Sequence, residues 1–218
     1  LYNENFKHGE YNLGSYKRGY NWLKRNGYLD NADELIFADD SCYAVKDLGT
    51  MVDKMSRTAK ADFWGVTETT GRERHLQPYF FVVKKPIIKS NILSRFLNQT
   101  PVQNIKEANY RYEMITPVLK KAGYKWKTAL PKLDNVVNRP KGLEPDPMYY
   151  PVTYTMTLSS PLLKRPTYHN GKFKEPYVKV LRYLKHTQPE TYAEIKESIR
   201  HIRYKKPWRM NNAPKAYY

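Results

Sequence analysis

The sequence of 218 residues contains a single cysteine, Cys42, and no apolar run near the length of a membrane span. One cysteine excludes an internal disulfide framework and a zinc site built on cysteines. A membrane-spanning helix would need an apolar run of about 18 residues. No signal peptide is recognisable, so the expected location is cytoplasmic. The fingerprints of phosphate-binding loops, dinucleotide-binding glycine loops, zinc proteases and serine hydrolases are missing as well.

Acidic residues are scarce relative to basic ones. Lys and Arg total 38 against 21 Asp and Glu, which gives a formal net charge of +17. Residues 151–218 alone carry 14 basic and 4 acidic side chains. A basic surface attracts polyanions, so nucleic acid, anionic lipid and phosphorylated substrates all stay open as partners. Hydrophobic residues make up 40% of the chain and aromatic residues 14%, which excludes a disordered chain.

Short apolar runs alternate with helical patterns in the first 130 residues. Runs typical of strands lie at 34–38, 63–66 and 78–83. Helical spacing predicts helices over 15–27, 47–58, 86–99 and 105–122, the first capped by Ser15 and ended by Gly27. This alternation predicts an α/β fold with a mainly parallel sheet flanked by helices.

The pattern changes after residue 130. Eight of the 15 prolines lie between Pro131 and Pro176, which predicts an ordered but irregular segment. Helical patterns return at about 176–186 and 190–203. We therefore expect an α/β core over 1–130, a proline-rich excursion over 131–175, and basic helices with a tail over 176–218. Because Leu1 is not an initiator methionine, the core is expected to be incomplete at its N-terminal side.

Polar residues at the end of the first predicted strand are candidates for a site. Asp39, Asp40 and Ser41 follow the strand 34–38, and open α/β sheets bind ligands beyond the carboxyl ends of their strands. Carboxylates there suit a divalent metal, Mg²⁺ or Mn²⁺, on a diphosphate, or hydrogen bonds to a ribose. The alternative is a polar loop that caps the next helix, because Asp and Ser are common turn residues.

Residues beside the second and third predicted strands are further candidates. His75 and Gln77 precede the strand 78–83, where they could contact a phosphate or sugar hydroxyls. The alternative places His75 in a surface loop. Trp64 and Gly65 could form a pocket wall, in which the glycine lets a ligand approach the backbone. The alternative is that the aromatic residues there belong to the core.

Glu113 lies among tyrosines in the predicted helix 105–122. A carboxylate in aromatic surroundings can have a raised pKa and act as a general base. The alternative is a solvated helix residue that pairs locally with Arg111 or Lys106.

Six blocks of sequence, in order over nearly the whole chain, share the pattern of one known family. Residues 3–6 followed by 14–19 are similar to its N-E-G-Y-D-F-G-S-Y-K-x-G, and residues 36–43 to its N-D-S-x-Y-G. The others are D-F-W-G-x-T at 62–67, H-L-Q-S-Y-F at 75–80, Y-E at 112–113 and P-x-x-K-R at 161–165. Together they resemble the rhamnan synthesis protein F family. The chain differs from the pattern in that Asn12 replaces Asp, Leu13 replaces Phe, Asp39 replaces Asn and Ala44 replaces Gly, and residues 7–10 are an insertion.

This resemblance implies a glycosyltransferase with a GT-A-like nucleotide-sugar fold, acting in bacterial cell-surface polysaccharide synthesis, often with rhamnose from a dTDP-sugar. It implies catalysis by Asp40 and Glu113. Asp39, where the family has Asn, adds a carboxylate that would strengthen a metal site at Asp39 and Asp40. It implies a sugar or acceptor pocket at Trp64, Gly65, His75 and Gln77. The donor-binding residues would be Gly14, Ser15, Lys17, Asp39, Asp40 and Ser41. The family's first strand and helix should precede Leu1.

The expected partners are a nucleotide-sugar donor and a polysaccharide or lipid-linked sugar acceptor. A nucleic-acid-binding module and a catalytically inactive scaffold stay open as other functions. Nucleic acid is the less favoured, because the tyrosines lie mostly in apolar patterns rather than interleaved with Lys and Arg.

The last predicted helix carries an isoleucine stripe bordered by cations. Such a helix suits docking on an anionic membrane surface, here the inner face of the plasma membrane. The alternative is that the isoleucines pack onto the core. The residues concerned are Ile195, Ile199 and Ile202 with Lys196, Arg200 and Arg203, followed by Lys205, Lys206, Trp208 and Arg209.

Overall fold

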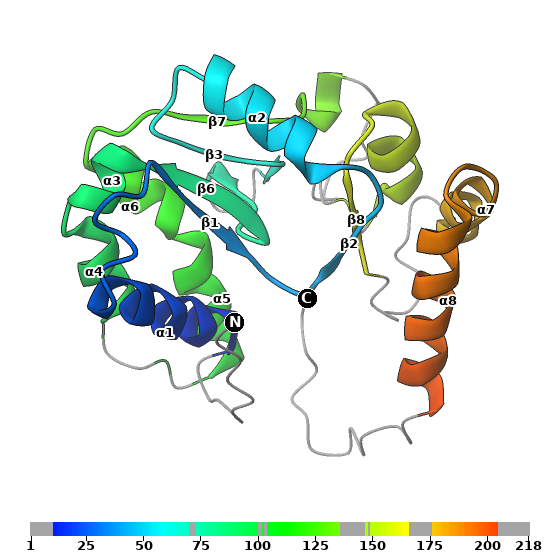
Figure 1. The fold of residues 1–218 in the computed structure, drawn as a ribbon, viewed down its shortest axis with the longest axis horizontal. Coiled ribbons are helices and arrows are strands. Elements are labelled where there is room, and N and C mark those ends of the chain that lie inside the picture. The colour runs from blue at the N-terminus through cyan, green and yellow to red at the C-terminus, as the bar shows by residue number, and fades with distance from the viewer. Residues whose placement is uncertain are drawn as a thin grey trace. The chain divides into compact units, whose positions relative to one another are not determined.

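The computed structural model describes residues 11–69, 73–99, 102, 104–135, 147, 149–165 and 176–204 (Figure 1). The chain divides into two compact units. Unit 1 consists of Leu1–Asp39 and Met55–Ala129, and unit 2 of Asp40–Lys54 and Leu130–Tyr218. Within the described ranges, no helix is both long enough and apolar enough to cross a membrane.

Unit 1 is built on a four-stranded sheet in the order β1-β6-β3-β7. The strands are β1 (Glu34–Ala38), β6 (Phe80–Lys84), β3 (Phe63–Gly65) and β7 (Trp126–Thr128). β6 runs antiparallel to both β1 and β3, whereas β7 is parallel to β3. The prediction of a mixed α/β fold is confirmed. The prediction of a mainly parallel sheet is wrong, because one of these three pairs is parallel.

The reversal of β6 follows from the connection that leads to it. Helix α2 (Leu48–Thr58) lies between β1 and β3, and further helices lie between β3 and β7, so these three strands run in one direction. Between β3 and β6 the chain forms an antiparallel pair, β4 (Glu68–Thr69) with β5 (His75–Leu76). The chain thereby returns beside β3 in the opposite direction. An apolar run in a sequence does not show whether the strand will run parallel or antiparallel to its neighbours.

Helix α1 spans Tyr11–Arg25 and begins earlier than predicted. Ser15 therefore lies inside the helix and does not cap it, because the buried face of the helix already includes Leu13. Its other end is as predicted. Gly27 has φ +73°, its N–H donates to Lys24 O, and the next N–H donates to Leu23 O. Glycine adopts this left-handed cap with the least strain.

The helices predicted over 86–99 and 105–122 are each divided in two. α3 (Lys85–Lys89) and α4 (Ile92–Leu97) are separated at Ser90, whose hydroxyl donates to Ile87 O at 2.8 Å. α5 (Ile105–Glu113) and α6 (Ile115–Lys121) meet at Met114. Pro117 explains the second break, because it lacks the N–H that would donate to Glu113 O and its ring crowds that carbonyl.

The main core of unit 1 lies between one face of the sheet and helices α1 and α3–α6. Phe37 of β1 stacks on Phe81 of β6 with 4.6 Å between ring centroids, and Tyr16 of α1 packs edge-on against Phe37. Trp64 and Val82 point to the opposite face and are fully buried too. Because both faces of β3 and β6 are covered, their sequences are continuous apolar runs rather than alternating ones.

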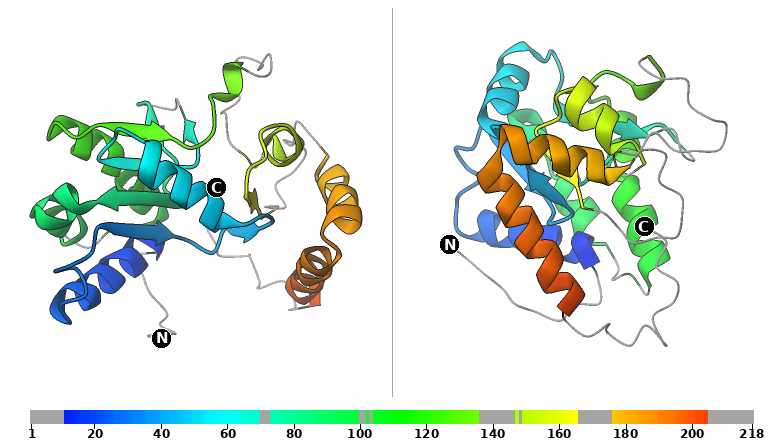
Figure 2. Two further views of the ribbon diagram at one scale, coloured as in Figure 1. Left: turned by 45° about the horizontal axis from the view of Figure 1, so that its top comes forward. Right: turned by 90° about the vertical axis from the view of Figure 1, so that its right-hand side faces the viewer.

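Unit 2 contains a two-stranded antiparallel pair, β2 (Cys42–Ala44) with β8 (Leu162–Lys164). Helix α7 (Tyr177–Thr187) packs against α8 (Pro189–Tyr204) (Figure 2). A 3₁₀ turn, Leu133–Asn135, and a π-helical turn, Thr153–Thr157, complete the unit. β8 and both turns lie in the segment whose sequence predicted no regular element.

Two isoleucines of α8, Ile195 and Ile199, pack onto the core of unit 2. Ile195 is buried with Val180, Leu184 and Leu163, and Ile199 packs against the same cluster. This packing agrees with the alternative interpretation of the stripe, in which the isoleucines belong to the core and do not face a membrane. The side chains of Ile202 and Arg203, and the basic residues from 205 onward, lie outside the described part of the structure.

Candidate functional site

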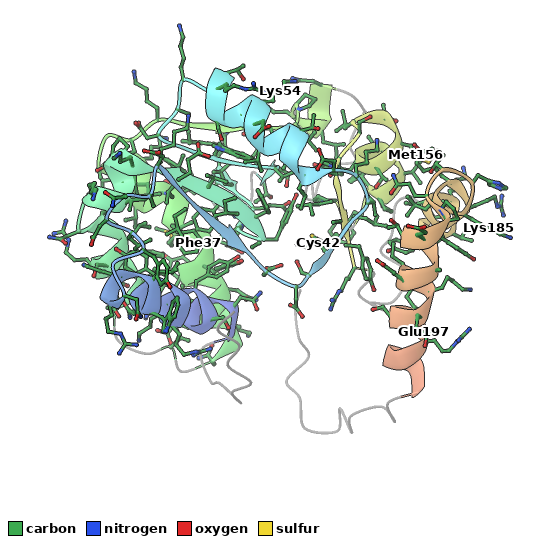
Figure 3. All side chains as sticks on the ribbon, viewed as in Figure 1. Phe37, Cys42, Lys54, Met156, Lys185 and Glu197 are labelled. Atoms are coloured by element: carbon green, nitrogen blue, oxygen red, sulfur yellow. The ribbon has the colours of Figure 1, made fainter. Side chains whose placement is uncertain are left out.

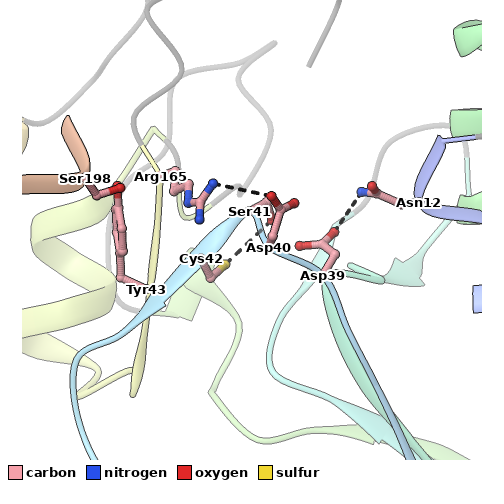
Figure 4. A network of polar contacts seen from close by, with 8 residues as sticks. All are labelled: Asn12, Asp39, Asp40, Ser41, Cys42, Tyr43, Arg165 and Ser198. Atoms are coloured by element: carbon pink, nitrogen blue, oxygen red, sulfur yellow. Dashed lines mark hydrogen bonds and ion pairs between the residues drawn. The ribbon is translucent and has the colours of Figure 1, made fainter. Parts of the chain in front are cut away.

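Asp39 stands directly after β1, at the edge of the sheet where β1 and β3 end and β6 begins. Its backbone N–H donates to Tyr79 O at 3.0 Å, which extends the pairing of β1 with β6. Its half-buried carboxylate accepts a hydrogen bond from Asn12 Nδ2 at 3.1 Å (Figure 4) and is 3.1 Å from Tyr112 Oη. Helices α1 and α5 therefore both hold the carboxylate that the sequence placed at the strand end.

Tyr112 of α5 is the centre of these contacts. Its Oη lies 2.6 Å from Pro78 O, 3.0 Å from Tyr16 Oη and 3.1 Å from Asp39 Oδ2. A hydroxyl has one proton, so these acceptors share it, and Tyr16 supplies a second donor 3.0 Å from Pro78 O. We call Asn12, Tyr16, Asp39, Pro78 and Tyr112 the Asp39 cluster.

The pKa of Tyr112 lies far above that of an ordinary tyrosine. Burial is the largest cause, and the nearby Tyr16 and Asp39 raise the pKa further. The ionised phenol would lose hydration and face the Asp39 carboxylate, so the neutral form is favoured. Tyr112 therefore stays a hydrogen-bond donor over the physiological pH range. A donor to an ionised carboxylate makes a stronger hydrogen bond than a neutral pair does.

Local sequence accounts for the position of each member of the Asp39 cluster. Asn12 and Tyr16 are four residues apart in α1, so they lie on the same face of that helix. The ring of Tyr16 packs on Phe37 and Phe81, which leaves its hydroxyl at the edge of the sheet. Tyr112 lies in the last turn of α5, before the break at Met114.

A second polar group lies beside the cluster. Thr67, just beyond β3, donates its hydroxyl to Gln77 Oε1 at 2.6 Å, and the same hydroxyl is 2.8 Å from Tyr79 Oη. All three side chains are buried. The amide of Gln77, predicted to contact a sugar, is thus hydrogen-bonded inside unit 1.

The other residues predicted for the sugar pocket are also buried. His75 in β5 is 5% exposed, and its Nδ1 lies 2.6 Å from Glu73 O, so the alternative of a surface loop residue is wrong. The Nε1 of Trp64 is buried with no hydrogen-bond partner among the described residues. A Cβ on Gly65 would come within 3.3 Å of both Leu76 and the backbone oxygen of Phe80. Atoms of the protein itself therefore occupy the space next to the Gly65 backbone that a ligand was expected to approach.

An ion pair between a buried glutamate and a half-exposed arginine links the two sides of the β4–β5 hairpin. Both oxygens of Glu68, whose side chain is 6% exposed, accept hydrogen bonds of 2.9 Å from Arg74. The Arg74 guanidinium also lies 4.9 Å from the ring centroid of Trp126. Our sequence analysis missed this pair, because its spacing of six residues becomes a contact only once the hairpin register is known.

Asp40 and Ser41 belong to unit 2, whose boundary with unit 1 falls between Asp39 and Asp40. The Asp40 side chain is 85% exposed and lies 3.4 Å from Arg165 Nη1 (Figure 4). The backbone N–H of Arg165 donates to Ser41 O at 2.7 Å, and its guanidinium stacks over Tyr43. The P-x-x-K-R block at 161–165, which contains Arg165, therefore lies beside Asp40 and Ser41.

The donor-binding residues predicted on α1 differ in exposure. Gly14 is buried, Lys17 is half-buried, and Ser15 is exposed and accepts a hydrogen bond from Arg18 at 3.3 Å.

Glu113 ends α5 and is half-buried, and its side chain makes no hydrogen bond or ion pair with another described residue. Arg111, the local partner considered for it, forms a salt bridge with Glu107 at 2.8 Å. In the parts of the chain that the structure describes, no three His, Cys, Asp or Glu residues are grouped to bind a metal.

The arrangement is a strand-end carboxylate held by side chains from two helices, in a chain whose sequence blocks resemble one family. The family model described as rhamnan synthesis protein F matches residues 5–206. The chain belongs to the rhamnan synthesis protein F family. Membership implies a part in rhamnan polysaccharide synthesis and confirms the resemblance drawn from the sequence blocks. No curated protein and no solved structure matches this member of the family.

Proposed function

We propose that this member of the rhamnan synthesis protein F family is a glycosyltransferase with a GT-A-like fold. It moves a sugar, rhamnose in the leading case, from a nucleotide-sugar donor to a growing cell-surface polysaccharide or a lipid-linked acceptor. The observation that carries the proposal is the Asp39 cluster, a carboxylate held by Tyr112 and Asn12 beyond the end of β1. Ligands of α/β sheets bind at this position, and family membership supplies the sugar chemistry.

Sugar transfer needs a base at the acceptor and stabilisation of the leaving group. The acceptor hydroxyl gives its proton to a carboxylate, and its oxygen bonds to the anomeric carbon of the donor. The bond from that carbon to the diphosphate breaks, and its electron pair leaves on the phosphate oxygen. We assign Asp39 and Asp40 to the donor side and Glu113 to the acceptor base, with the aspartates as alternative bases. A carboxylate already fixed by hydrogen bonds, as Asp39 is, needs little reorganisation during the reaction.

A divalent metal, Mg²⁺ or Mn²⁺, is part of the proposal. The donor set fits, because Mg²⁺ is usually bound by one or two carboxylates together with phosphate oxygens and water. Asp39, whose carboxylate is held by Asn12 and Tyr112, would supply one carboxylate, and Asp40 is the candidate for a second. When bound, the ion would offset negative charge on the diphosphate.

A nucleic-acid-binding module is less well supported. Its aromatic residues would have to be exposed to stack on bases. The buried side chains instead include Tyr16, Tyr20, Tyr79, Tyr150 and Tyr154. A catalytically inactive scaffold agrees with family membership as well, so it is an outcome that the experiment must separate.

The test is a donor panel. The protein is incubated with dTDP-, UDP- and GDP-linked sugars and rhamnose-terminated acceptors, and products are detected by mass spectrometry. We expect transfer from one donor, lost in Asp39→Ala and retained in Asp33→Ala, an exposed aspartate at the other end of β1. A thermal-shift screen with the same donors and with oligonucleotides runs in parallel. No product and no donor-induced shift would contradict the proposal and favour the scaffold, and a shift with oligonucleotides alone would favour the nucleic-acid module.

A further inference from the structure

One face of helix α7 in unit 2 is exposed and carries basic side chains and one valine. Its opposite face is buried in the core through Val180 and Leu184. Helical geometry places residues three, four and seven apart on a common face. The exposed residues are Val178, Lys179, Arg182, Lys185 and His186, which we call the α7 basic face.

The α7 basic face differs from an ordinary solvated helix surface because α7 has no acidic residue. Exposed cations of the neighbouring helix lie among glutamates, and Arg200 pairs with Glu197 of α8 at 2.9 Å (Figure 3 labels Glu197 and Lys185). Mixed signs of this kind are typical of a solvent-facing helix. Lys179, Arg182 and Lys185 form no ion pair with any residue in the described ranges.

We propose that the α7 basic face docks the protein on an anionic lipid surface. Cations on one side of a straight helix can approach a flat surface together, and each adds electrostatic attraction to anionic headgroups. Val178, which is 57% exposed, lies among them and would enter the boundary between headgroups and acyl chains. The membrane contact expected from the isoleucine stripe of α8 is thereby assigned to α7, since Ile195 and Ile199 of that stripe pack onto the core.

The chemistry of the face favours lipid over nucleic acid. Surfaces that bind single strands combine cations with exposed aromatic rings on which bases stack. Tyr177 and Tyr183 of α7 are packed against the core, and the exposed face contains neither. The inference is independent of sugar transfer and would hold for an inactive scaffold as well.

Vesicle co-sedimentation tests the proposal with the full chain. Phosphatidylcholine vesicles with and without phosphatidylserine are compared at low and high salt. One variant is K179A/R182A/K185A, and the matched control is K120A/K121A/K127A, which removes three exposed lysines from unit 1. Each cation at an anionic surface strengthens binding about fivefold, so the α7 variant should bind about 100-fold more weakly. The control should bind nearly as the unchanged protein does, and thermal melts check that both variants fold.

A second variant keeps every cation. Val178→Glu puts an acidic group into the face and should also weaken binding to phosphatidylserine vesicles. Equal losses in both triple variants would show that net charge alone binds, and would overturn the proposal. It would also be overturned by equal binding to neutral vesicles, by no binding to anionic vesicles at low salt, or by an oligonucleotide that binds the α7 basic face more tightly than the vesicles do. Because sedimentation does not measure sugar transfer, these outcomes leave the proposed enzymatic function to its own test.

Discussion

Asn12 donates a hydrogen bond from Nδ2 to Oδ2 of Asp39 at 3.1 Å, and so joins the first helix to the end of the first strand. These are two of the positions at which the chain differs from the sequence pattern that it resembles, with Asn in place of Asp at 12 and Asp in place of Asn at 39. The structure shows that the two departures are partners. Asp at 12 with Asn at 39 would also comprise one amide and one carboxylate, so the exchange keeps the formal charge of the pair.

Exchanging the pair back should therefore be tolerated better than changing one member. Asn12→Asp alone sets two carboxylates close together, and like charges at that distance oppose ionisation of both. Asp39→Asn alone should be milder, because two amides can still form a hydrogen bond. We expect Asn12→Asp to lower the free energy of unfolding by about 1 kcal/mol or more, and the double variant to recover most of it. Urea denaturation of the four proteins measures the coupling, and additive effects would contradict the partnership.

Tyr112→Phe removes the hydroxyl that contacts Pro78 O, Tyr16 and Asp39. The loss of a buried hydrogen bond should lower the free energy of unfolding by about 1 kcal/mol at neutral pH. Donor binding should weaken too, since Asp39 loses one of its two donors from the helices. Tyr110→Phe, on the same helix but 49% exposed, is the matched control. Equal effects of the two substitutions would argue against a special role for Tyr112.

Tyr112 also makes stability depend on pH in the alkaline range. Its pKa is raised in the folded protein, so the unfolded chain releases the proton first, near the ordinary tyrosine value of about 10. The contribution to stability is fully present below that pH. It decreases above it by about 1.4 kcal/mol per pH unit. The slope should be shallower in Tyr112→Phe when urea denaturation is followed from neutral to strongly alkaline pH, and an unchanged slope would contradict this assignment.

Asp40→Asn should separate function from stability. The side chain is 85% exposed and pairs with Arg165 at 3.4 Å, and such surface pairs contribute about 0–1 kcal/mol. The melting temperature should therefore hardly change, whereas nucleotide-sugar turnover should be abolished if Asp40 serves the donor. Asp33→Asn, which breaks another exposed pair with Lys85, should leave both unchanged. Turnover of Asp40→Asn at the normal rate would remove Asp40 from the site.

Glu113→Gln tests the choice of base. Loss of a positioned base lowers kcat by about 10²–10⁴-fold, while donor binding should be retained. Glu107→Gln on the same helix breaks the salt bridge to Arg111 and should leave kcat nearly unchanged. If Glu113→Gln is fully active, the base must be sought at Asp39 or Asp40. If it fails to fold, Glu113 is a structural residue.

The sequence by itself determined the features that depend on neighbours along the chain. The strand Glu34–Ala38, the polar residues after it and the glycine cap at Gly27 follow from local apolar runs and backbone preferences. The candidate site could be predicted as far as Asp39, because a carboxylate after a buried strand has a defined place in an α/β sheet. The sequence analysis named Glu113 of α5 as a candidate base and did not identify Tyr112 beside it as a partner of Asp39. Adjacent residues on a helix point in different directions, and only the packing of α5 shows that Tyr112 contacts Asp39.

The tertiary structure decided the remainder, because it depends on contacts between distant residues. Asn12 and Asp39 are 27 positions apart, and Asp39 and Tyr112 are 73 apart, so no local spacing predicts either contact. The direction of β6 likewise depends on the β4–β5 hairpin, and the burial of His75 on the strands and helices packed over it. Local pattern can state that a residue is polar or apolar. The tertiary structure decides which partner forms a hydrogen bond with a polar group, because loop closure and sheet register bring the two residues together.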